Sequence, residues 1–208
     1  MLGTLVEIRA RGPAPAAAVE QAFRAIERVH HAMSAQESTS DIARLRSGRR
    51  AALDPWTRRV LERAEELRLL SDGLFDCAAC GYSLDGIAKG FAVDRAIDCL
   101  EAAGLTAGVV NAGGDLRVFG EHYEPLHVRP AAMPDRVIYV GRVRHAAVAT
   151  SASRGVVHPL GGACRAAGVT ILARDCMTAD ALTKPCLLEP QHADELARRV
   201  AARVLRSE

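Results

Sequence analysis

Aromatic side chains are scarce in this chain of 208 residues, at 4% of the composition. No basic run interleaved with aromatic residues occurs, so the stacking platforms and charged grooves of nucleic-acid-binding proteins are not expected. Long apolar runs are missing as well, since none approaches the roughly 18 residues that a membrane-spanning helix needs. The first residues, Met1–Arg9, lack the basic and apolar regions of a signal peptide, so we expect the chain as given to be cytoplasmic.

Composition otherwise describes an ordinary globular protein. Hydrophobic residues make up 49% of the chain and the formal net charge is +2. A chain of this length can bury a substantial core. No internal repeat, linker or shift of composition divides it, so the sequence predicts one domain over residues 1–208.

The chain has six cysteines, and their spacing gives little indication of a metal site or a redox site. One Cys-x-x-Cys motif, Cys77-Ala78-Ala79-Cys80, has no second pair at zinc-finger spacing. A zinc or redox role is therefore less expected than small buried thiols.

Hydrophobic periodicity predicts an α+β fold with a largely antiparallel β-sheet packed with helices. Helices are expected at residues 15–33, 41–45, 55–70, 87–103, 178–184 and 193–205. Strands are expected at residues 4–10, 108–111, 116–119, 126–129, 137–140, 146–150 and 168–173. Ser40 and Asp54 are expected to cap two of the helices, and Pro185 is expected to end another.

The most informative stretch runs from Ser83 to Asp115. The loop Ser83–Gly86 opens a helix, and a tight turn, Ala112–Asp115, follows the next strand. Unpaired N–H groups and the positive end of the helix dipole make such a helix start a good place for a phosphate. Lys89, in the first turns of the helix, would add a full positive charge.

Two motifs in this stretch carry a family resemblance. They are Gly86-Ile87-Ala88-Lys89-Gly90 and, after one strand, Asn111-Ala112-Gly113-Gly114-Asp115. Together they resemble the ApbE-type flavin transferases, the FAD:protein FMN transferases. Collinear blocks that support the resemblance are Leu2-Gly3-Thr4, Ser40–Leu45, Ser71–Asp76, Ala149-Thr150-Ser151, His158-Pro159 and Ala179–Leu182.

The resemblance implies an ApbE fold, similar to the T-fold, and a phosphoryl-transfer reaction. Members of the family bind FAD with Mg²⁺ and transfer the FMN moiety to a threonine hydroxyl of a target flavoprotein, releasing AMP. Two alternatives stay open: cleavage of FAD without a protein acceptor, and a non-catalytic flavin-binding or partner-binding module. Family members are often exported from the cytoplasm.

The resemblance also implies roles for individual residues. For the metal it implies the carboxylate of Asp180, a carbonyl at or near Gly86, and Thr183. For the flavin nucleotide it implies Ser83, Asp85, Gly86, Lys89, Asn111, Gly113, Gly114 and Asp115. His158 is expected to position or deprotonate the acceptor threonine, and Lys184 to act on the pyrophosphate.

Several positions depart from the family pattern. Gln36 replaces an aromatic residue that often packs near FAD, and only six residues separate Asp76 from Ser83, where fuller members carry several tens. Four residues after Asp180 the chain has Lys184 in place of a threonine. A lysine at this position could replace a metal ligand by its own charge or reach the pyrophosphate directly.

Each of these functional interpretations has a plainer alternative. Asp180 and Lys184 could form a surface ion pair at i,i+4 spacing. Lys89 could pair with Asp85 or Asp94 on its own helix. The segment 111–115 could be a hairpin turn whose glycines have positive φ.

Overall fold

The computed structural model describes residues 2–48, 52–130, 133, 135–152 and 164–205. Among these residues, six strands form one sheet in the order β1-β2-β3-β6-β7-β8, and β4 pairs with β5 in a separate hairpin. Every ladder between neighbouring strands is antiparallel. The predicted α+β fold with an antiparallel sheet is thus confirmed.

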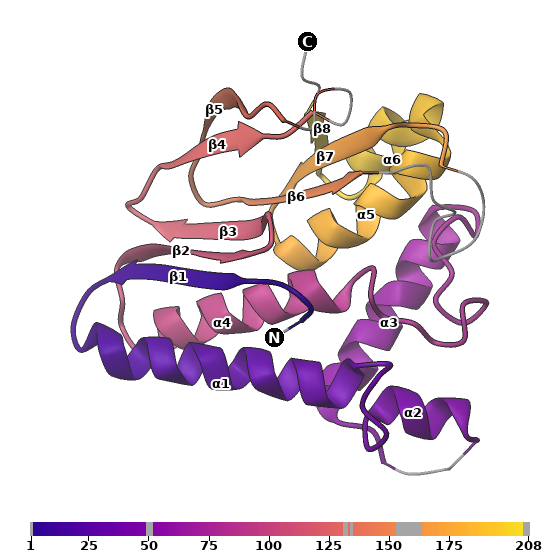
Figure 1. Cartoon of the computed structure of the whole chain (residues 1–208), viewed down its shortest axis with the longest axis horizontal. Helices are drawn as coiled ribbons and strands as arrows, with labels where there is room; N and C mark the ends of the chain where they lie inside the picture. The colour runs from indigo at the N-terminus through magenta and orange to yellow at the C-terminus, as the bar shows by residue number, and fades with distance from the viewer. Residues whose placement is uncertain (1, 49–51, 131–132, 134, 153–163, 206–208) are drawn as a thin grey trace.

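The strands are short and the helices vary in length (Figure 1). The strands are β1 Val6–Arg11, β2 Ala107–Ala112, β3 Asp115–Gly120, β4 Glu124–Val128, β5 Ile138–Val143, β6 Ala147–Ala152, β7 Gly168–Ala173 and β8 Arg203–Leu205. The helices are α1 Pro15–Met33, α2 Asp41–Arg46, α3 Pro55–Leu70, α4 Ala88–Ala102, α5 Cys176–Leu188 and α6 Ala193–Arg199, with a short 3-10 turn at Pro190–His192.

Helices cover one face of the six-stranded sheet. In Figure 1, α1 and α4 lie along the strands β1 to β3, and α5 lies along β6 and β7. Strand residues alternate between the two faces, so Val110 packs into the large core beneath these helices while Val109 points to the other face. The central helix α4 is buried on several sides, and Phe91, Val93 and Ile97 have almost no exposed surface.

The β4–β5 hairpin covers part of the opposite face. A second, smaller cluster of buried residues lies there, made up of Val109, Leu116, Val118, Leu126, Val128, Val143 and Val148. Because both faces of the central strands are packed, the start of β3 is buried where it meets the helical layer. Asp115, the first residue of β3, is only 1% exposed.

Helix starts follow the capping rules used in the sequence analysis. Ser40 Oγ accepts a hydrogen bond from the N–H of Ala43 at 3.0 Å, and Asp54 Oδ1 accepts one from Trp56 at 2.8 Å. Both predicted caps are confirmed, and α1 has the predicted bounds. Local chemistry decides these ends.

Two predictions near the C-terminus are wrong. Pro185 does not end α5, which continues to Leu188 because Cys186, Leu187 and Leu188 are buried in the core. The predicted helix over residues 193–205 ends at Arg199, and Arg203–Leu205 form strand β8, which pairs with β7. The pairing of an open sheet edge outweighs the helical periodicity of this segment.

Helices α4 and α5 approach closely at Gly90. A Cβ atom at Gly90 would lie 2.2 Å from the carbonyl oxygen of Cys176, so any other residue would push the two helices apart. This contact brings the start of α4 next to the first turns of α5 and places Lys89 on the same side as Asp180. The glycine of the Lys89-Gly90 motif is therefore a packing requirement.

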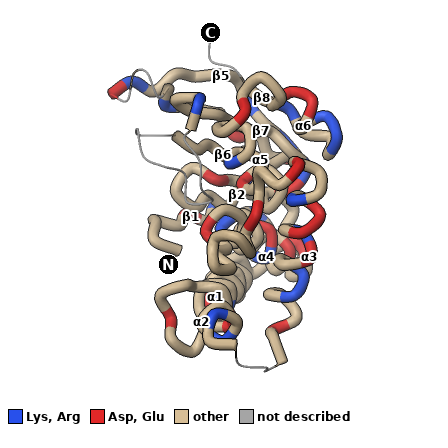
Figure 2. The backbone as a smooth tube through the Cα atoms, turned by 90° about the vertical axis from the view of Figure 1, so that its right-hand side faces the viewer, with Lys and Arg blue, Asp and Glu red and all other residues tan. Residues whose placement is uncertain are grey.

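Charged residues are distributed along the chain without a large region of one sign. Figure 2 shows basic and acidic residues interspersed over α3, α4 and α6. Among the described residues, no helix combines the length and the hydropathy needed to cross a membrane.

Candidate active site

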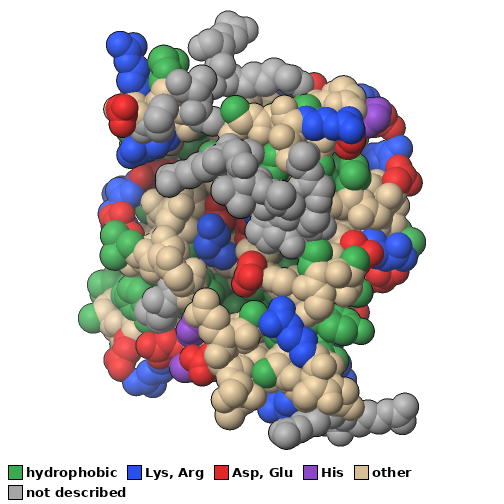
Figure 3. Space-filling view, turned by 45° about the vertical axis from the view of Figure 1, so that its right-hand side comes forward, with side chains coloured by type: hydrophobic (Ala, Val, Ile, Leu, Met, Phe, Trp, Pro, Cys, Tyr) green, Lys and Arg blue, Asp and Glu red, His purple; other side chains and the backbone are tan. Residues whose placement is uncertain are grey.

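Four charged side chains meet where α4, β3 and α5 come together. Lys89 comes from the first turn of α4, Asp115 begins β3, and Asp180 and Lys184 lie one turn apart on α5. We refer to these four residues as the charge centre. On one face of the molecule, basic and acidic side chains lie side by side in a central hollow (Figure 3).

Lys89 and Asp115 form the first ion pair of the charge centre. Lys89 Nζ lies 2.9 Å from Asp115 Oδ2. At this distance the ammonium and the carboxylate make a charge-assisted contact. Both alternative partners considered for Lys89, Asp85 and Asp94, are wrong. The interpretation that Lys89 belongs to the site gains support from this contact with a second motif.

Asp180 and Lys184 form the second ion pair. Lys184 Nζ contacts Asp180 Oδ1 and also lies 2.9 Å from the carbonyl oxygen of Asp180. The two residues are 1% and 8% exposed. A surface pair is therefore the wrong interpretation, since both charges have left water and depend on each other for compensation.

At the N-terminus of α4, where the sequence predicts a phosphate site, one amide binds a carboxylate of the protein itself. The N–H of Gly90 donates to Asp180 Oδ2 at 3.0 Å. Gly90 is in the first turn of α4, where N–H groups have no partner within the helix. The helix dipole and the Lys184 ammonium thus stabilise the same carboxylate from two sides.

Burial controls the electrostatics of the centre. Burial, together with repulsion from Asp180, raises the pKa of Asp115 to about 6, although Lys89 and Lys184 oppose the rise. For Lys89, burial lowers the pKa, but the carboxylates of Asp115 and Asp180 outweigh it and leave the pKa raised. All four groups therefore interact, and Lys89 carries its charge at neutral pH.

The residues predicted to hold a metal lie together but are already occupied. Thr183 Oγ1 donates to the carbonyl oxygen of Asp180 at 2.7 Å and shares a hydrogen bond with Ser151 Oγ at 2.8 Å. Gly86 lies against the stem of Lys184, since a Cβ there would be 3.2 Å from Lys184 Cε. In the part of the chain that the structure describes, no three His, Cys, Asp or Glu residues group as metal ligands.

The Asn111–Asp115 motif is both a hairpin turn and part of the site. Gly113 and Gly114 have φ values of 63° and 100°, and Asn111 Oδ1 accepts a hydrogen bond from the N–H of Gly114 at 2.9 Å. A Cβ at Gly113 would lie 2.2 Å from Thr4 Oγ1, so only glycine fits against Thr4. The turn aims Asp115 into the charge centre.

A pocket of about 300 Å³ adjoins the centre. Lys89 and Asp85 line one side of it, and the end of α1 with the following loop lines the other. Its wall comprises Leu2, Gly3, Val29, His30, Met33, Ser34, Ala35, Gln36, Asp85, Ala88 and Lys89. Ser83 is near the rim, where its Oγ donates to Asp85 Oδ2 at 2.9 Å. The volume of the pocket is at the small end for ligand pockets, which suits one ring system of a nucleotide.

The sequence analysis made two further predictions, one for His158 and one for the Cys-x-x-Cys motif. His158 is outside the described residues, so its role stays a prediction. The thiols of the Cys-x-x-Cys motif are free, and burial raises the pKa of Cys77 to about 12. A thiol of that pKa is a poor metal ligand or nucleophile, which favours the buried-thiol interpretation.

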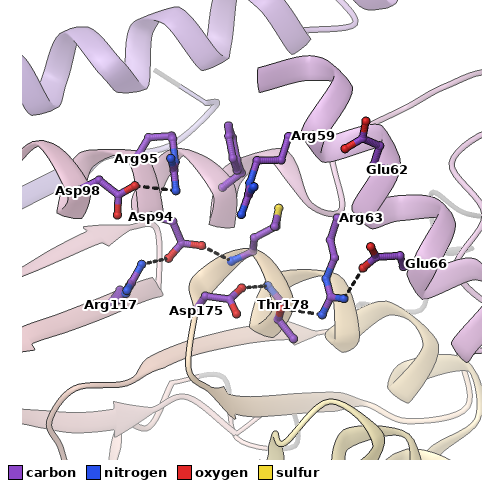
Figure 4. A pocket seen from close by; sticks show the side chains of 12 residues that line it. Arg59, Glu62, Arg63, Glu66, Asp94, Arg95, Asp98, Arg117, Asp175 and Thr178 are labelled. Atoms are coloured by element: carbon purple, nitrogen blue, oxygen red, sulfur yellow. Dashed lines mark hydrogen bonds and ion pairs between the residues drawn. The ribbon is translucent and has the colours of Figure 1, made fainter. Parts of the chain in front are cut away.

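A second pocket, of about 460 Å³, lies between α3, α4 and α5, away from the charge centre (Figure 4). Its walls carry ion pairs between neighbouring side chains, among them Arg95 with Asp98 and Arg63 with Glu66. At its floor, Asp94 accepts hydrogen bonds from the N–H groups of Cys176 and Met177 at 2.9 and 2.8 Å. We interpret this region as a structural support of α5.

Sequence reasoning did not predict the observed contacts of two residues that shape the site. Asp94 fixes the first turn of α5, and Ser151 on β6 holds Thr183. Ser151 lies in a block that carries the family resemblance, and Asp94 follows the Gly86–Gly90 motif by four residues, which was the available signal. Their partners are remote in the sequence, so no spacing rule could identify the contacts.

Comparison with known proteins agrees with the fold and the motifs. A model of the ApbE family matches residues 2–82 and 79–205 of the chain. The FAD:protein FMN transferase of Rhodobacter capsulatus is 26% identical over 178 residues, which cover 59% of this chain and 34% of that protein. The chain thus spans about a third of the length of this curated relative.

Solved structures of similar fold include proteins of Vibrio cholerae and Thermotoga maritima. The flavin transferase ApbE from Vibrio cholerae has a TM-score of 0.80 at 20% identity, with 98% of this chain and 89% of that chain covered. The ApbE protein from Thermotoga maritima has a TM-score of 0.81 at 22% identity, with 100% and 95% covered. The predicted ApbE fold is confirmed over essentially the whole chain.

Proposed function

The chain belongs to the ApbE family, and from this premise we propose that it transfers the FMN moiety of FAD to a threonine hydroxyl of a target flavoprotein, releasing AMP. The observation that carries the proposal is the charge centre beside a ligand-sized pocket. Lys89 is shared by the two, because it lines the pocket and pairs with Asp115. A pyrophosphate that lies between pocket and centre would meet this ammonium.

The proposed reaction is a displacement at phosphorus. The threonine oxygen forms a bond to the phosphorus on the riboflavin side, and the bond from that phosphorus to the bridging oxygen breaks. The bridging oxygen leaves with AMP, and the threonine proton passes to a base. Such a transfer depends mainly on neutralising the phosphate charge and holding attacking and leaving oxygens in line.

Residues of this chain can supply the first requirement. Lys89 adds its charge at the mouth of the pocket. Lys184 Nζ has three N–H donors, of which two are directed at oxygens of Asp180, so among the described residues one remains for a phosphate oxygen. The positive end of α4 is directed toward the same place.

The base for the threonine proton is proposed from the sequence. His158 is the candidate, because its imidazole can accept a proton near neutral pH. The flavin or adenine ring would occupy the pocket that Gln36 and Lys89 line. Ser83, Asp85, Gly113 and Gly114 are proposed to contact FAD around it.

The Mg²⁺ that the resemblance predicts finds no open site among the described residues. Mg²⁺ prefers about six oxygen ligands in octahedral geometry and commonly binds carboxylates and water. Here Asp180 is bound by Lys184 and Gly90, and Thr183 directs its proton at the carbonyl oxygen of Asp180. The residues therefore do not fit this ion as placed, and no step above is assigned to it.

Incubation of the purified protein with FAD tests the proposal. AMP release is measured by chromatography in EDTA and in Mg²⁺. Each reaction is run with and without a flavoprotein that the Rhodobacter capsulatus enzyme uses as its acceptor. That enzyme serves as the positive control. We expect AMP release together with flavin fluorescence on the denatured acceptor.

The other outcomes separate the two alternatives. AMP release that an acceptor does not alter, with no covalent flavin on the acceptor, would indicate FAD hydrolysis. Binding of FAD without AMP release in any tube would indicate a non-catalytic flavin-binding module. Both results would contradict the proposed transfer to this acceptor.

A further inference from the structure

We propose that the Lys184 ammonium takes the place of a divalent metal in this chain, so that its reaction with FAD proceeds without Mg²⁺. The proposal deepens the proposed function and rests on it for the reaction, but not for the lack of an open metal site among the described residues. It starts from the disagreement between the predicted metal ligands and the observed contacts of Lys184.

Lys184 contacts two of the predicted ligand positions, Asp180 with its Nζ and Gly86 with its stem. The Nζ contacts Asp180 Oδ1 and lies 2.9 Å from the carbonyl oxygen of the same residue. The stem of Lys184 passes against Gly86, where a Cβ would be 3.2 Å from Cε and 3.4 Å from Cγ. A cation is therefore already present between the carboxylate of Asp180 and the Gly86 turn.

The charges of the centre are balanced without a metal. Lys89 and Lys184 carry two positive charges, and Asp115 and Asp180 carry two negative charges when both are ionised. A divalent ion next to Asp180 would meet a full positive charge within hydrogen-bond distance of the same carboxylate. In a buried site this repulsion is weakly screened.

Lys184 is not free to move aside. It is 8% exposed, and its stem lies against Gly86, on the side of Gly86 that Phe75 also approaches. Displacing the ammonium would leave it buried without the oxygens of Asp180. Such unpaired buried charges are strongly disfavoured.

The ligand set also lacks what Mg²⁺ needs. Asp180 is the one carboxylate of the predicted set, and its second oxygen accepts the N–H of Gly90. Thr183, fully buried, is held by Ser151 and by the Asp180 carbonyl oxygen. An ammonium needs only a few oxygen acceptors, which this site provides.

Titration with Mn²⁺, followed by its EPR signal in the absence of flavin, tests the proposal. Mn²⁺ stands in for Mg²⁺ because both are hard divalent cations that bind oxygen ligands. We expect no saturable binding to the native protein. In Lys184→Thr, Mn²⁺ affinity is expected to rise at least about tenfold, because a positive charge beside Asp180 is removed.

Three variants control this experiment. Lys184→Arg keeps the charge and is expected to bind no Mn²⁺. Arg24→Thr removes one positive charge from an exposed i,i+4 pair with Glu20 and is expected to behave like the native protein. In Lys184→Thr, a second change of Asp180→Asn is expected to abolish the gained binding.

Saturable Mn²⁺ binding to the native protein that Asp180→Asn removes would overturn the proposal. A folded Lys184→Thr variant, judged by circular dichroism, that binds Mn²⁺ no better than the native protein would also overturn it. The native titration is decisive by itself if the variant does not fold. AMP release from FAD that is equal in EDTA and Mg²⁺ would support it.

This design separates the two proposals. The Mn²⁺ titration contains no FAD and no acceptor, so failure of FMN transfer leaves its result unchanged. Transfer that proceeds only with Mg²⁺ would contradict the role of Lys184 while supporting the proposed function.

Discussion

Two ion pairs with buried carboxylates contact α5, and they differ in how many of their hydrogen-bonding groups have partners. At the first turn, Asp94 accepts the N–H groups of Cys176 and Met177 and the guanidinium of Arg117, at 2.8–2.9 Å. One turn further, Asp180 accepts one N–H group and pairs with Lys184. The first carboxylate is enclosed by structural partners.

The second pair differs by what surrounds it. Lys184 keeps one N–H donor that no acceptor takes among the described residues, and Lys89 with Asp115 lies beside it. A pocket adjoins Lys89. Both pairs are buried, so burial alone does not identify a functional site. A functional site is indicated instead by an N–H donor that has no acceptor among the described residues and lies near a pocket.

The largest expected effect comes from breaking the pair of Asp94 with Arg117. Asp94→Asn should lower the free energy of unfolding by about 3–5 kcal/mol. The reason is that Arg117 and two N–H groups of α5 lose the buried negative charge that they contact. Urea denaturation followed by circular dichroism measures this. Asp98→Asn is the control on the same helix, since its pair with Arg95 is more exposed, and it should cost less than about 1 kcal/mol. Equal losses in the two variants would contradict the distinction.

The next effect is a pH dependence of stability that Asp115 causes. Burial raises the pKa of Asp115 from 3.8 to about 6 in the folded protein. The folded state therefore binds this proton more tightly than the unfolded state does. The stabilising contribution is fully present below pH 4 and is lost as the pH rises through about 6.

Comparison with Asp115→Asn isolates this contribution. Between pH 4 and pH 7, the free energy of unfolding of the native protein should fall relative to that of the variant by about 3 kcal/mol. Urea denaturation at several pH values measures the difference. A difference that does not change with pH, or that grows in favour of the native protein, would contradict the raised pKa.

The smallest effect compares a buried and an exposed pair of the same i,i+4 spacing. Lys184→Met leaves Asp180 without its charged donor and should cost about 1.5–3 kcal/mol of stability. Arg24→Met breaks the exposed pair with Glu20 and should cost less than about 0.5 kcal/mol. Thermal and urea denaturation of both variants would show whether burial makes the difference. Similar costs would mean that the Asp180–Lys184 pair behaves like a surface pair.

Most of the fold could be predicted from the sequence because local rules decide it. Strand alternation, the caps Ser40 and Asp54, and the glycine turn at Gly113 all act within a few residues. The end of α5 and the strand β8 could not be predicted in this way. Burial of the segment after Pro185 and pairing with β7 depend on partners that are remote along the chain.

The site could be predicted in its membership but not in its contacts. The motifs identified Lys89, Asp115, Asp180 and Lys184, and these four do meet. Their partners were not predictable, because Lys89 reaches β3 rather than a neighbour on its own helix. The packing of Lys184 against Gly86, on which the proposal about the metal position rests, could be seen only in the structure.

The most direct test of the account is the affinity of the protein for FAD and for riboflavin in EDTA, measured by flavin fluorescence. The account places the pyrophosphate against Lys89 and Lys184, without a metal, so FAD should bind at least about tenfold more tightly than riboflavin. Lys89→Met should reduce this preference. Equal affinities for the two flavins, or a preference that requires Mg²⁺, would contradict it.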